Sequence, residues 1–219
     1  MGQEIDLMRL YPKGKSRQGL RPEITEEDRR ISKQFGFDYF DGDRRYGYGG
    51  FNYHPRFWTD TVRLFRDHYD LPEDASILDI GCAKGFMLTD FQKLLPRARL
   101  AGVDLSSYAV ERAQPEVKAF IQMGNARQLP FPDQSFDLVI AINTLHNLKR
   151  AECIQALREV ERVKRRHAFV MVDGWRNDEE RAAMHAWVLT AETMMHADEW
   201  RQVFAEAGYT GDYNFWTVS

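Results

Sequence analysis

From residue 75 onward, the sequence alternates short apolar runs with segments of helical periodicity. The helical patterns cover 86–95, 107–113 and 151–165. The apolar runs are ASILDIG, RLAGVDL, AFIQMGN, SFDLVIAIN and HAFVMVDG. Apolar strands separated by helices are typical of a parallel sheet with helices on both faces. The sequence therefore predicts a doubly wound α/β fold with five such strands.

The last forty residues continue this pattern less regularly. Asn177, followed by Glu180, predicts the capped start of a helix. The inward stripe expected for that helix consists of Ala183, Trp187, Ala191 and Met194. A shorter helix is expected from Asp198 to Gly208, and YNFWTVS predicts one last strand.

The chain before the first strand has three parts. Residues 1–22 are polar and basic without an apolar period, which predicts a loose arm; an RNA-binding tail is the alternative. Thr25 predicts the start of a helix that ends at Gly36. The aromatic and glycine-rich residues 35–58 predict an ordered loop or lid.

An amphipathic helix should connect the lid to the sheet. Its apolar stripe is Trp58, Val62, Phe65 and Tyr69, and it should end before Pro72. We expect one compact domain overall, with the arm, lid and helix in 1–72 and a ligand-binding α/β part in 73–219.

Composition narrows the classes of function. The chain of 219 residues has 30 Lys and Arg against 33 Asp and Glu, a net charge of −3, so a nucleic-acid partner is not favoured. Two cysteines form no disulfide framework. No run reaches the roughly 18 apolar residues of a membrane span. We expect a cytoplasmic protein with no membrane partner, and the sequence leaves a homodimer open.

The turn after the first strand has the features of a cofactor loop. Gly81 and Gly85 allow a tight turn and a close approach of a ligand to the backbone. A dinucleotide site would prefer G-x-G-x-x-G. Here Ala83 and Phe86 occupy the second and third glycine positions. A cofactor other than a dinucleotide is therefore favoured.

Two polar residues follow the next strands. Asp104 ends the second strand 23 positions after Gly81, where a carboxylate can accept hydrogen bonds from ribose hydroxyls; capping of the next helix is the alternative. Asn125 follows the third strand and offers an acceptor and a donor to an adenine edge, or else stabilises a turn.

The segments ILDIGCAKGF, AGVDLS and GNARQLPFPDQSFDLVIAINTLHNL resemble the successive motifs of class I S-adenosylmethionine-dependent methyltransferases. The resemblance covers about residues 75–208. It implies a Rossmann-like sheet that normally ends in an antiparallel pair and has seven strands. Only eleven residues follow Gly208, so we expect six or seven strands, with one of that pair missing, very short or replaced by a partner.

The resemblance also implies which residues bind S-adenosyl-L-methionine. Asp104 would bind the ribose, Leu105 would lie against the adenine, and Asn125 with Ala126 would bind the adenine edge. The residues around the methionine part would be Asp79, Gly81, Ala83 and Gly85. Cys82, in the same loop, and Asn143, at the end of the fourth strand, complete the expected cofactor site, although Cys82 also suits simple packing.

Two tyrosines of the lid are further candidates for the cofactor site. Tyr46 and Tyr48 can place aromatic faces against a sulfonium cation, and the neighbouring glycines suggest hinges. A packed aromatic loop is the alternative. No metal is expected, because no His, Cys or carboxylate spacing resembles a zinc site.

Three residues are candidates for acceptor chemistry. His146, just past the fourth strand, is the first candidate base, with a structural role as the alternative. Asp173, at the end of the fifth strand, can orient an acceptor or cap a helix. His196 can close the pocket or lie on the surface.

These features predict methyl transfer to an O or N atom of a small polar or aromatic metabolite, such as a sugar, an amino acid or a natural-product intermediate. The alternatives are an RNA or protein methyltransferase and a noncatalytic S-adenosylmethionine-binding protein.

Overall fold

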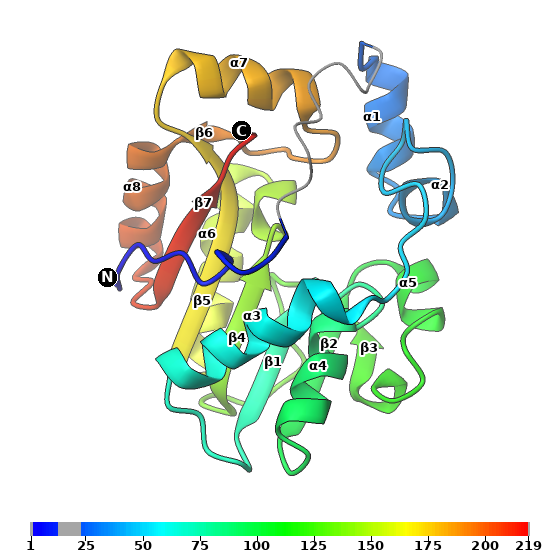
Figure 1. Cartoon of the computed structure of the whole chain (residues 1–219). Coiled ribbons are helices and arrows are strands. Elements are labelled where there is room, and N and C mark those ends of the chain that lie inside the picture. The colour runs from blue at the N-terminus through cyan, green and yellow to red at the C-terminus, as the bar shows by residue number, and fades with distance from the viewer. Residues whose placement is uncertain (1, 13–22, 219) are drawn as a thin grey trace.

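A seven-stranded sheet forms the centre of the computed structural model, which describes residues 2–12 and 23–218 (Figure 1). The order is β3-β2-β1-β4-β5-β6, and β7 also pairs with β5. The strands are β1 (Ser76–Ile80), β2 (Arg99–Asp104), β3 (Ile121–Met123), β4 (Phe136–Ile142), β5 (Lys164–Trp175), β6 (Met195–His196) and β7 (Asp212–Trp216). All of these pairings are parallel, which confirms the predicted parallel sheet.

Helices cover both faces of the sheet. On one face, α3 (Pro55–His68) and α4 (Phe86–Leu94) pack on strand residues such as Ile77 and Ile140. On the other, α6 (Arg150–Val163) and α8 (Ala197–Ala207) pack on Leu78 and Val139. Successive strand residues thus enter opposite cores, as the alternation of side chains along a strand requires.

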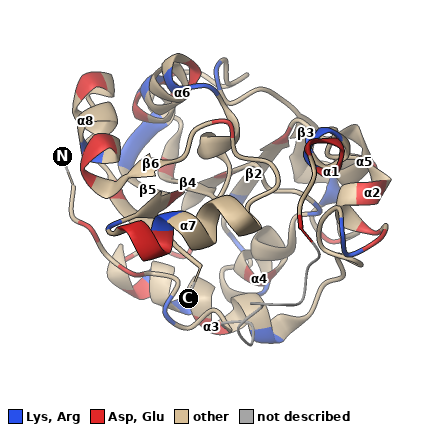
Figure 2. Ribbon diagram, turned by 90° about the horizontal axis from the view of Figure 1, so that it is seen from above, with Lys and Arg blue, Asp and Glu red and all other residues tan. Residues whose placement is uncertain are grey.

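Four further helices lie toward the carboxyl ends of the strands (Figures 1 and 2). They are α1 (Glu26–Ser32), α2 (Phe37–Phe40), α5 (Ser107–Glu111) and α7 (Asp178–Trp187). The predicted start of α1 is confirmed, because Thr25 and Asp28 form a reciprocal capping box. Single 3₁₀ turns at Lys118–Phe120 and Leu145–Asn147 complete the helical elements of the described residues.

The expected antiparallel pair at the end of the sheet is absent from the described residues. Instead β7 runs parallel to β5, with Phe169 opposite Asp212 and Asp173 opposite Trp216. The chain reaches β7 through α8, which ends at Gly208 in the left-handed conformation at φ +71°. The helix between β6 and β7 reverses the chain, so β7 continues the parallel βαβ pattern.

The prediction of a loose arm is wrong for residues 2–12. The Ile5 amide donates to the Tyr213 carbonyl (2.9 Å), and the Tyr213 amide donates to the Gln3 carbonyl (3.0 Å). The Leu7 side chain of this segment is fully buried and packs in the core on the α3 and α4 face of the sheet. The outer edge of β7 exposes backbone hydrogen-bonding groups, and residues 3–5 bind the amide and carbonyl of Tyr213 at this edge. Residues 13–22, where the RNA-binding tail was the alternative, lie outside the described part of the chain.

The helix predicted from Asn177 is shorter than its apolar stripe suggested. It ends at Trp187, so Ala191 and Met194 lie beyond it and are not part of a helical stripe. The Arg29 guanidinium binds the carbonyls of His185 and Val188, at the end of the helix. Tertiary hydrogen bonds therefore replace the next helical turn.

Within the described ranges, no helix combines the length and apolarity that crossing a bilayer demands.

Candidate functional site

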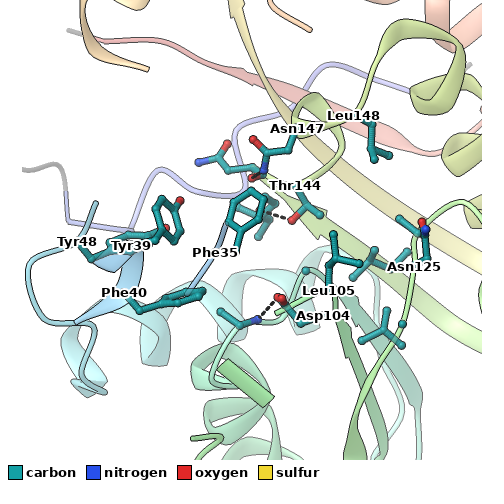
Figure 3. A pocket seen from close by; sticks show the side chains of 18 residues that line it. Phe35, Tyr39, Phe40, Tyr48, Asp104, Leu105, Asn125, Thr144, Asn147 and Leu148 are labelled. Atoms are coloured by element: carbon teal, nitrogen blue, oxygen red, sulfur yellow. Dashed lines mark hydrogen bonds between the residues drawn. The ribbon is translucent and has the colours of Figure 1, made fainter. Parts of the chain in front are cut away.

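A cavity lies at the carboxyl ends of β1, β2 and β4, beneath the aromatic N-terminal segment (Figure 3). The residues that line it are Phe35, Tyr39, Phe40, Tyr48, Ile80, Gly81, Ala83, Val103, Asp104, Leu105, Gly124, Asn125, Ala126, Ile142, Asn143, Thr144, Asn147 and Leu148. Loops after parallel strands thus form one side and aromatic rings the other, as expected for ligand sites in open α/β sheets.

The loop after β1 depends on two left-handed glycines. Gly81 has φ +75°, and a Cβ there would lie 2.1 Å from the Thr144 hydroxyl oxygen. Gly85, also at φ +75°, has no room for a Cβ beside Ile121 and begins α4. Both positions therefore require glycine, for conformation and for space.

The Asp104 carboxylate holds the loop in place. Its Oδ2 accepts a hydrogen bond from the Ala83 amide (2.7 Å), and its Oδ1 accepts one from the Ser106 amide (2.8 Å). Each carboxylate oxygen can accept a further hydrogen bond, and Asp104 lines the cavity. The capping alternative for Asp104 is not seen, because the Ser106 hydroxyl caps α5 by accepting from the Ala109 amide.

Two acids lie close together at this loop, Asp79 buried and Asp104 half-buried. Burial raises the pKa of Asp104 despite its backbone hydrogen bonds. Burial, together with repulsion from Asp104, raises the pKa of Asp79 to about 7. A cationic ligand in the cavity would relieve both effects.

The expected adenine end of the cavity holds Leu105, Asn125 and Ala126. The Leu105 side chain is 61% exposed, an apolar surface open to the cavity. Asn125 Oδ1 accepts hydrogen bonds from the Arg127 amide (3.0 Å) and the Arg127 guanidinium Nε (3.2 Å). Asn125 thus stabilises a turn, as one alternative held, while it also lines the cavity.

Several predicted residues lie outside the lining. Asp79, Cys82 and Gly85 belong to the β1 strand and its loop, but they are buried and do not line the cavity. Asn143 does line the cavity, with φ +52°. The roles of these residues in cofactor binding stay predictions.

The predicted lid is a packed aromatic segment that forms one wall of the cavity. Tyr48 lines the cavity, but Tyr46 does not, and its carbonyl accepts a hydrogen bond from the Ser32 hydroxyl (2.7 Å). A Cβ at Gly47 would lie 2.0 Å from the Tyr39 carbonyl oxygen. Close packing therefore accounts for Gly47 without a hinge.

A buried ion pair joins this segment to the cofactor loop. The Lys84 ammonium, with a side chain 7% exposed, contacts the Asp41 carboxylate (2.6 Å) and the Phe51 carbonyl (2.8 Å). The Tyr108 hydroxyl donates to the same carboxylate (2.7 Å). Lys84 thus connects the loop after β1 with the aromatic wall above it.

His146 and Asp173 form a buried pair beneath the cavity. The Asp173 amide donates to His146 Nδ1 (2.9 Å), so the ring hydrogen is on Nε2, which lies 3.5 Å from Asp173 Oδ2. Burial lowers the pKa of His146 to about 3 and raises the pKa of Asp173 to about 8. Neither side chain lines the cavity, and a catalytic role for either stays a prediction.

A phenol connects this pair to the cavity. Tyr39 lines the cavity, and its ring meets the Tyr48 ring edge to face, with centroids 5.3 Å apart. Its hydroxyl lies near Tyr48, Thr190 and Asp173. Thr190 is buried in the segment between α7 and β6. Tyr39 therefore lies between Asp173, at the end of β5, and the cavity.

His196 lies elsewhere. Its Nδ1 accepts from the Asp198 amide (3.2 Å) at the start of α8, and its Nε2 lies 3.2 Å from the Arg176 carbonyl. It does not line the cavity, so its placement matches the surface alternative.

The sequence interpretation missed Phe35, Tyr39, Phe40 and Thr190 as site residues. The first three belong to the aromatic segment that was expected to form a lid. Within that segment, the adjacent glycines favoured Tyr46 and Tyr48 as site residues, whereas no glycine pattern marks Phe35, Tyr39 or Phe40 in the same way. Nothing local marks Thr190, because its contact with Tyr39 joins positions 151 residues apart.

Comparisons with known proteins agree with this geometry. Residues 77–167 match a family described as "Methyltransferase domain". A demethylmenaquinone methyltransferase of Symbiobacterium thermophilum is 35% identical over 114 residues, 48% of this chain and 45% of the relative. A malonyl-[acyl-carrier protein] O-methyltransferase of Legionella pneumophila is 28% identical over 127 residues, 56% of this chain and 44% of the relative.

The structural comparison supports the fold. The YcgJ protein of Bacillus subtilis superposes with a TM-score of 0.55 at 24% identity, covering 67% of this chain and 66% of that protein. The alignments with the first curated relatives span only 59%, 37% and 45% of those proteins. The matched region holds the loop after β1, Asp104 and the strands that carry them. Residues 77–167 therefore match a methyltransferase domain, which agrees with the resemblance to class I S-adenosylmethionine-dependent methyltransferases noted in the sequence.

Proposed function

We propose that this chain binds S-adenosylmethionine in the cavity and catalyses transfer of its methyl group to an O or N atom of a small polar or aromatic acceptor. The observation that carries the proposal is the position of Asp104. Its carboxylate is oriented by two backbone amides beside a left-handed glycine loop and an exposed Leu105, all in one cavity at the strand ends.

The residues present fit this cofactor. S-adenosylmethionine supplies an electrophilic methyl group on a sulfonium cation, next to a nucleoside. Asp104 is placed to accept hydrogen bonds from the ribose, and Leu105 and Ala126 offer apolar contact to the adenine. Burial raises the pKa values of Asp79 and Asp104, and a cation bound nearby would stabilise their ionised forms.

The remaining side chains of the cavity suit positioning. Phe35, Tyr39, Phe40 and Tyr48 form an aromatic wall that excludes water and presents ring faces to a cation. Holding an acceptor in line with the methyl group supplies much of the acceleration in such a displacement. Their role is therefore to bind and orient an acceptor.

Thermal unfolding with S-adenosylmethionine, S-adenosylhomocysteine or NAD tests the cofactor assignment. A ligand at 100 times its dissociation constant stabilises the folded state by about 2.7 kcal/mol. We expect this stabilisation with the first two compounds and none with NAD. Stabilisation by NAD alone, or by none of the three, would overturn the proposal. Release of S-adenosylhomocysteine on addition of an acceptor separates an enzyme from a noncatalytic binding protein.

A further inference from the structure

The end of the cavity away from Leu105 and Asn125 is uncharged. Of the described residues that line the cavity, Asp104 alone carries a charged side chain. The others near the aromatic end are rings, the Thr144 hydroxyl and the amides of Asn143 and Asn147. Figure 3 shows Tyr39, Phe40 and Tyr48 on the side of the cavity opposite Asn125 and Leu105.

The basic side chains around this end already have partners. Lys84 binds Asp41, Arg45 binds Asp28 (2.5 Å), and Lys33 binds Glu192 (2.6 Å). The guanidinium groups of Arg29 and Arg44 bind backbone carbonyls. None of these described basic groups lines the cavity, so an acceptor with a carboxylate or phosphate would bury its charge there without a direct counter-ion from them, which costs several kcal/mol.

Hydroxyl groups and the amides of Asn143 and Asn147 provide the polar contacts at this end. Tyr39 lines the cavity, and its hydroxyl lies near Tyr48 and Thr190. A phenol can donate one hydrogen bond and accept two, so this hydroxyl can bind a hydroxyl group of a ligand. Burial raises the pKa of Tyr39 well above its usual range, so this group stays a neutral hydroxyl.

The rings around these hydroxyls form flat and edge-on surfaces. The Phe40 and Tyr48 rings are nearly parallel, with centroids 6.1 Å apart and an interplanar angle of 11°. Phe35 meets Tyr39 edge to face at 5.2 Å. Such surfaces bind a planar ring through offset and edge contacts.

From this arrangement we infer that the acceptor is an uncharged aromatic ring that carries a hydroxyl group, held by a hydrogen bond to Tyr39 and by the neighbouring rings. The inference rests on the proposed function and names the acceptor class of the same cavity. Thr190 acts as a positioning residue in this inference, because it lies next to the Tyr39 hydroxyl.

Three probes of similar shape test the inference on protein loaded with S-adenosylhomocysteine. They are methyl 4-hydroxybenzoate, 4-hydroxybenzoate and methyl benzoate, with affinities measured by ligand-observed NMR at pH 7. We expect the neutral phenol to bind at least about tenfold more tightly than the carboxylate, because the carboxylate must be desolvated. It should also bind about three- to tenfold more tightly than methyl benzoate, which lacks the hydroxyl.

Variants assign the hydroxyl preference to Tyr39. Tyr39→Phe should bind methyl 4-hydroxybenzoate and methyl benzoate equally and should still reject the carboxylate. Thr190→Val should weaken the hydroxyl preference, and Thr190→Ser should restore it. Tyr53→Phe is the matched control, because Tyr53 bonds Lys93 (2.8 Å) and does not line the cavity. It should leave all three affinities unchanged.

Specific results would overturn the inference. These are equal or tighter binding of 4-hydroxybenzoate, an unchanged hydroxyl preference in Tyr39→Phe, and no binding of any probe at millimolar concentration. Calorimetry with S-adenosylhomocysteine is done first. Failure of the wild-type protein to bind it counts against the proposed function, whereas normal binding with no preference among probes counts against the acceptor class alone.

Discussion

The two ends of the cavity are built in different ways. The proposed nucleoside end, which holds Ala83, Asp104, Leu105 and Asn125, uses loops that directly follow β1, β2 and β3. Its key contacts, such as Ala83 to Asp104, join the ends of neighbouring strands. The aromatic end combines a segment before the sheet with Thr190, which follows α7. Strand order thus determines the first end, whereas packing between distant segments determines the second.

This difference separates the tasks of the two ends. A parallel sheet brings its loops together whatever the acceptor is, so the nucleoside end suits a common cofactor. The aromatic end can change without disturbing the strands, so it suits the specific partner of the reaction. Lys84 links the two, because it lies in the first loop and binds Asp41 of the aromatic segment.

The largest effect should come from Asp104 at the nucleoside end. Asp104→Ala removes the proposed ribose ligand and two charge-assisted hydrogen bonds that shape the loop, so we expect S-adenosylmethionine affinity to fall roughly a hundredfold or more. Calorimetry measures the change. At the other end, Tyr39→Phe should alter the affinity for S-adenosylhomocysteine less than about threefold. Similar losses in both variants would break the distinction between the ends.

The buried pair of His146 and Asp173 should make the free energy of unfolding depend on pH. Burial raises the pKa of Asp173 to about 8, whereas an unfolded Asp titrates near 3.9. Between these values the folded state binds more protons, so this group lowers the unfolding free energy as pH rises. His146, with a pKa of about 3, adds little change above pH 6.5.

Asp173→Asn removes this dependence, because the amide cannot ionise. Between pH 6.5 and 8, we expect the wild-type protein to lose roughly 1–2 kcal/mol of unfolding free energy relative to Asp173→Asn, as measured by urea denaturation. Parallel pH profiles for the two proteins would show that Asp173 ionises normally in the folded state.

A double-mutant cycle measures the interaction between Lys84 and Asp41, which joins the loop after β1 to the aromatic segment. Lys84→Met, Asp41→Asn and the double variant should give a coupling of about 1 kcal/mol in unfolding free energy, because the ammonium is buried and has several acceptors. The matched control is the exposed pair of Arg30 and Glu27 in α1, with side chains 63% and 60% exposed. Its coupling should be much smaller, since solvent screens surface ion pairs. Equal couplings would contradict a structural role for Lys84.

The smallest effect should be a proton released on cofactor binding. With the pKa of Asp79 at about 7, this acid is half protonated at neutral pH, and a cation nearby favours the ionised form. We expect up to about half a proton released per S-adenosylmethionine and less with S-adenosylhomocysteine, which lacks the sulfonium charge. Calorimetry in two buffers of different ionisation enthalpy gives the number, and an unchanged number in Asp79→Asn would assign the proton to another group.

The sequence allowed prediction of the sheet and of most of the nucleoside end. Apolar runs and caps are local signals, so the strands and the start of α1 at Thr25 were found from neighbouring residues. Gly81, Ala83, Asp104, Leu105, Asn125, Ala126 and Asn143 were predicted and do line the cavity. Their positions follow from strand ends, which local patterns specify.

What could not be predicted depends on contacts between distant segments. Nothing near Lys84 indicates Asp41, and nothing near Tyr39 indicates Thr190. The packing of residues 3–5 on β7 likewise joins the two ends of the described chain. The burial of His146 beneath the cavity follows from the position of β5, which the sequence around His146 does not specify.

The backbone pairing of Gln3 and Ile5 with Tyr213 also has a consequence for self-association. A foreign strand can extend the sheet at this margin only after the segment detaches, since the amides it would need are already occupied. At the opposite margin, β3 offers a template of just three residues. Fibril-like growth at these margins should therefore be slow in concentrated solutions, and deletion of residues 2–7 should accelerate it.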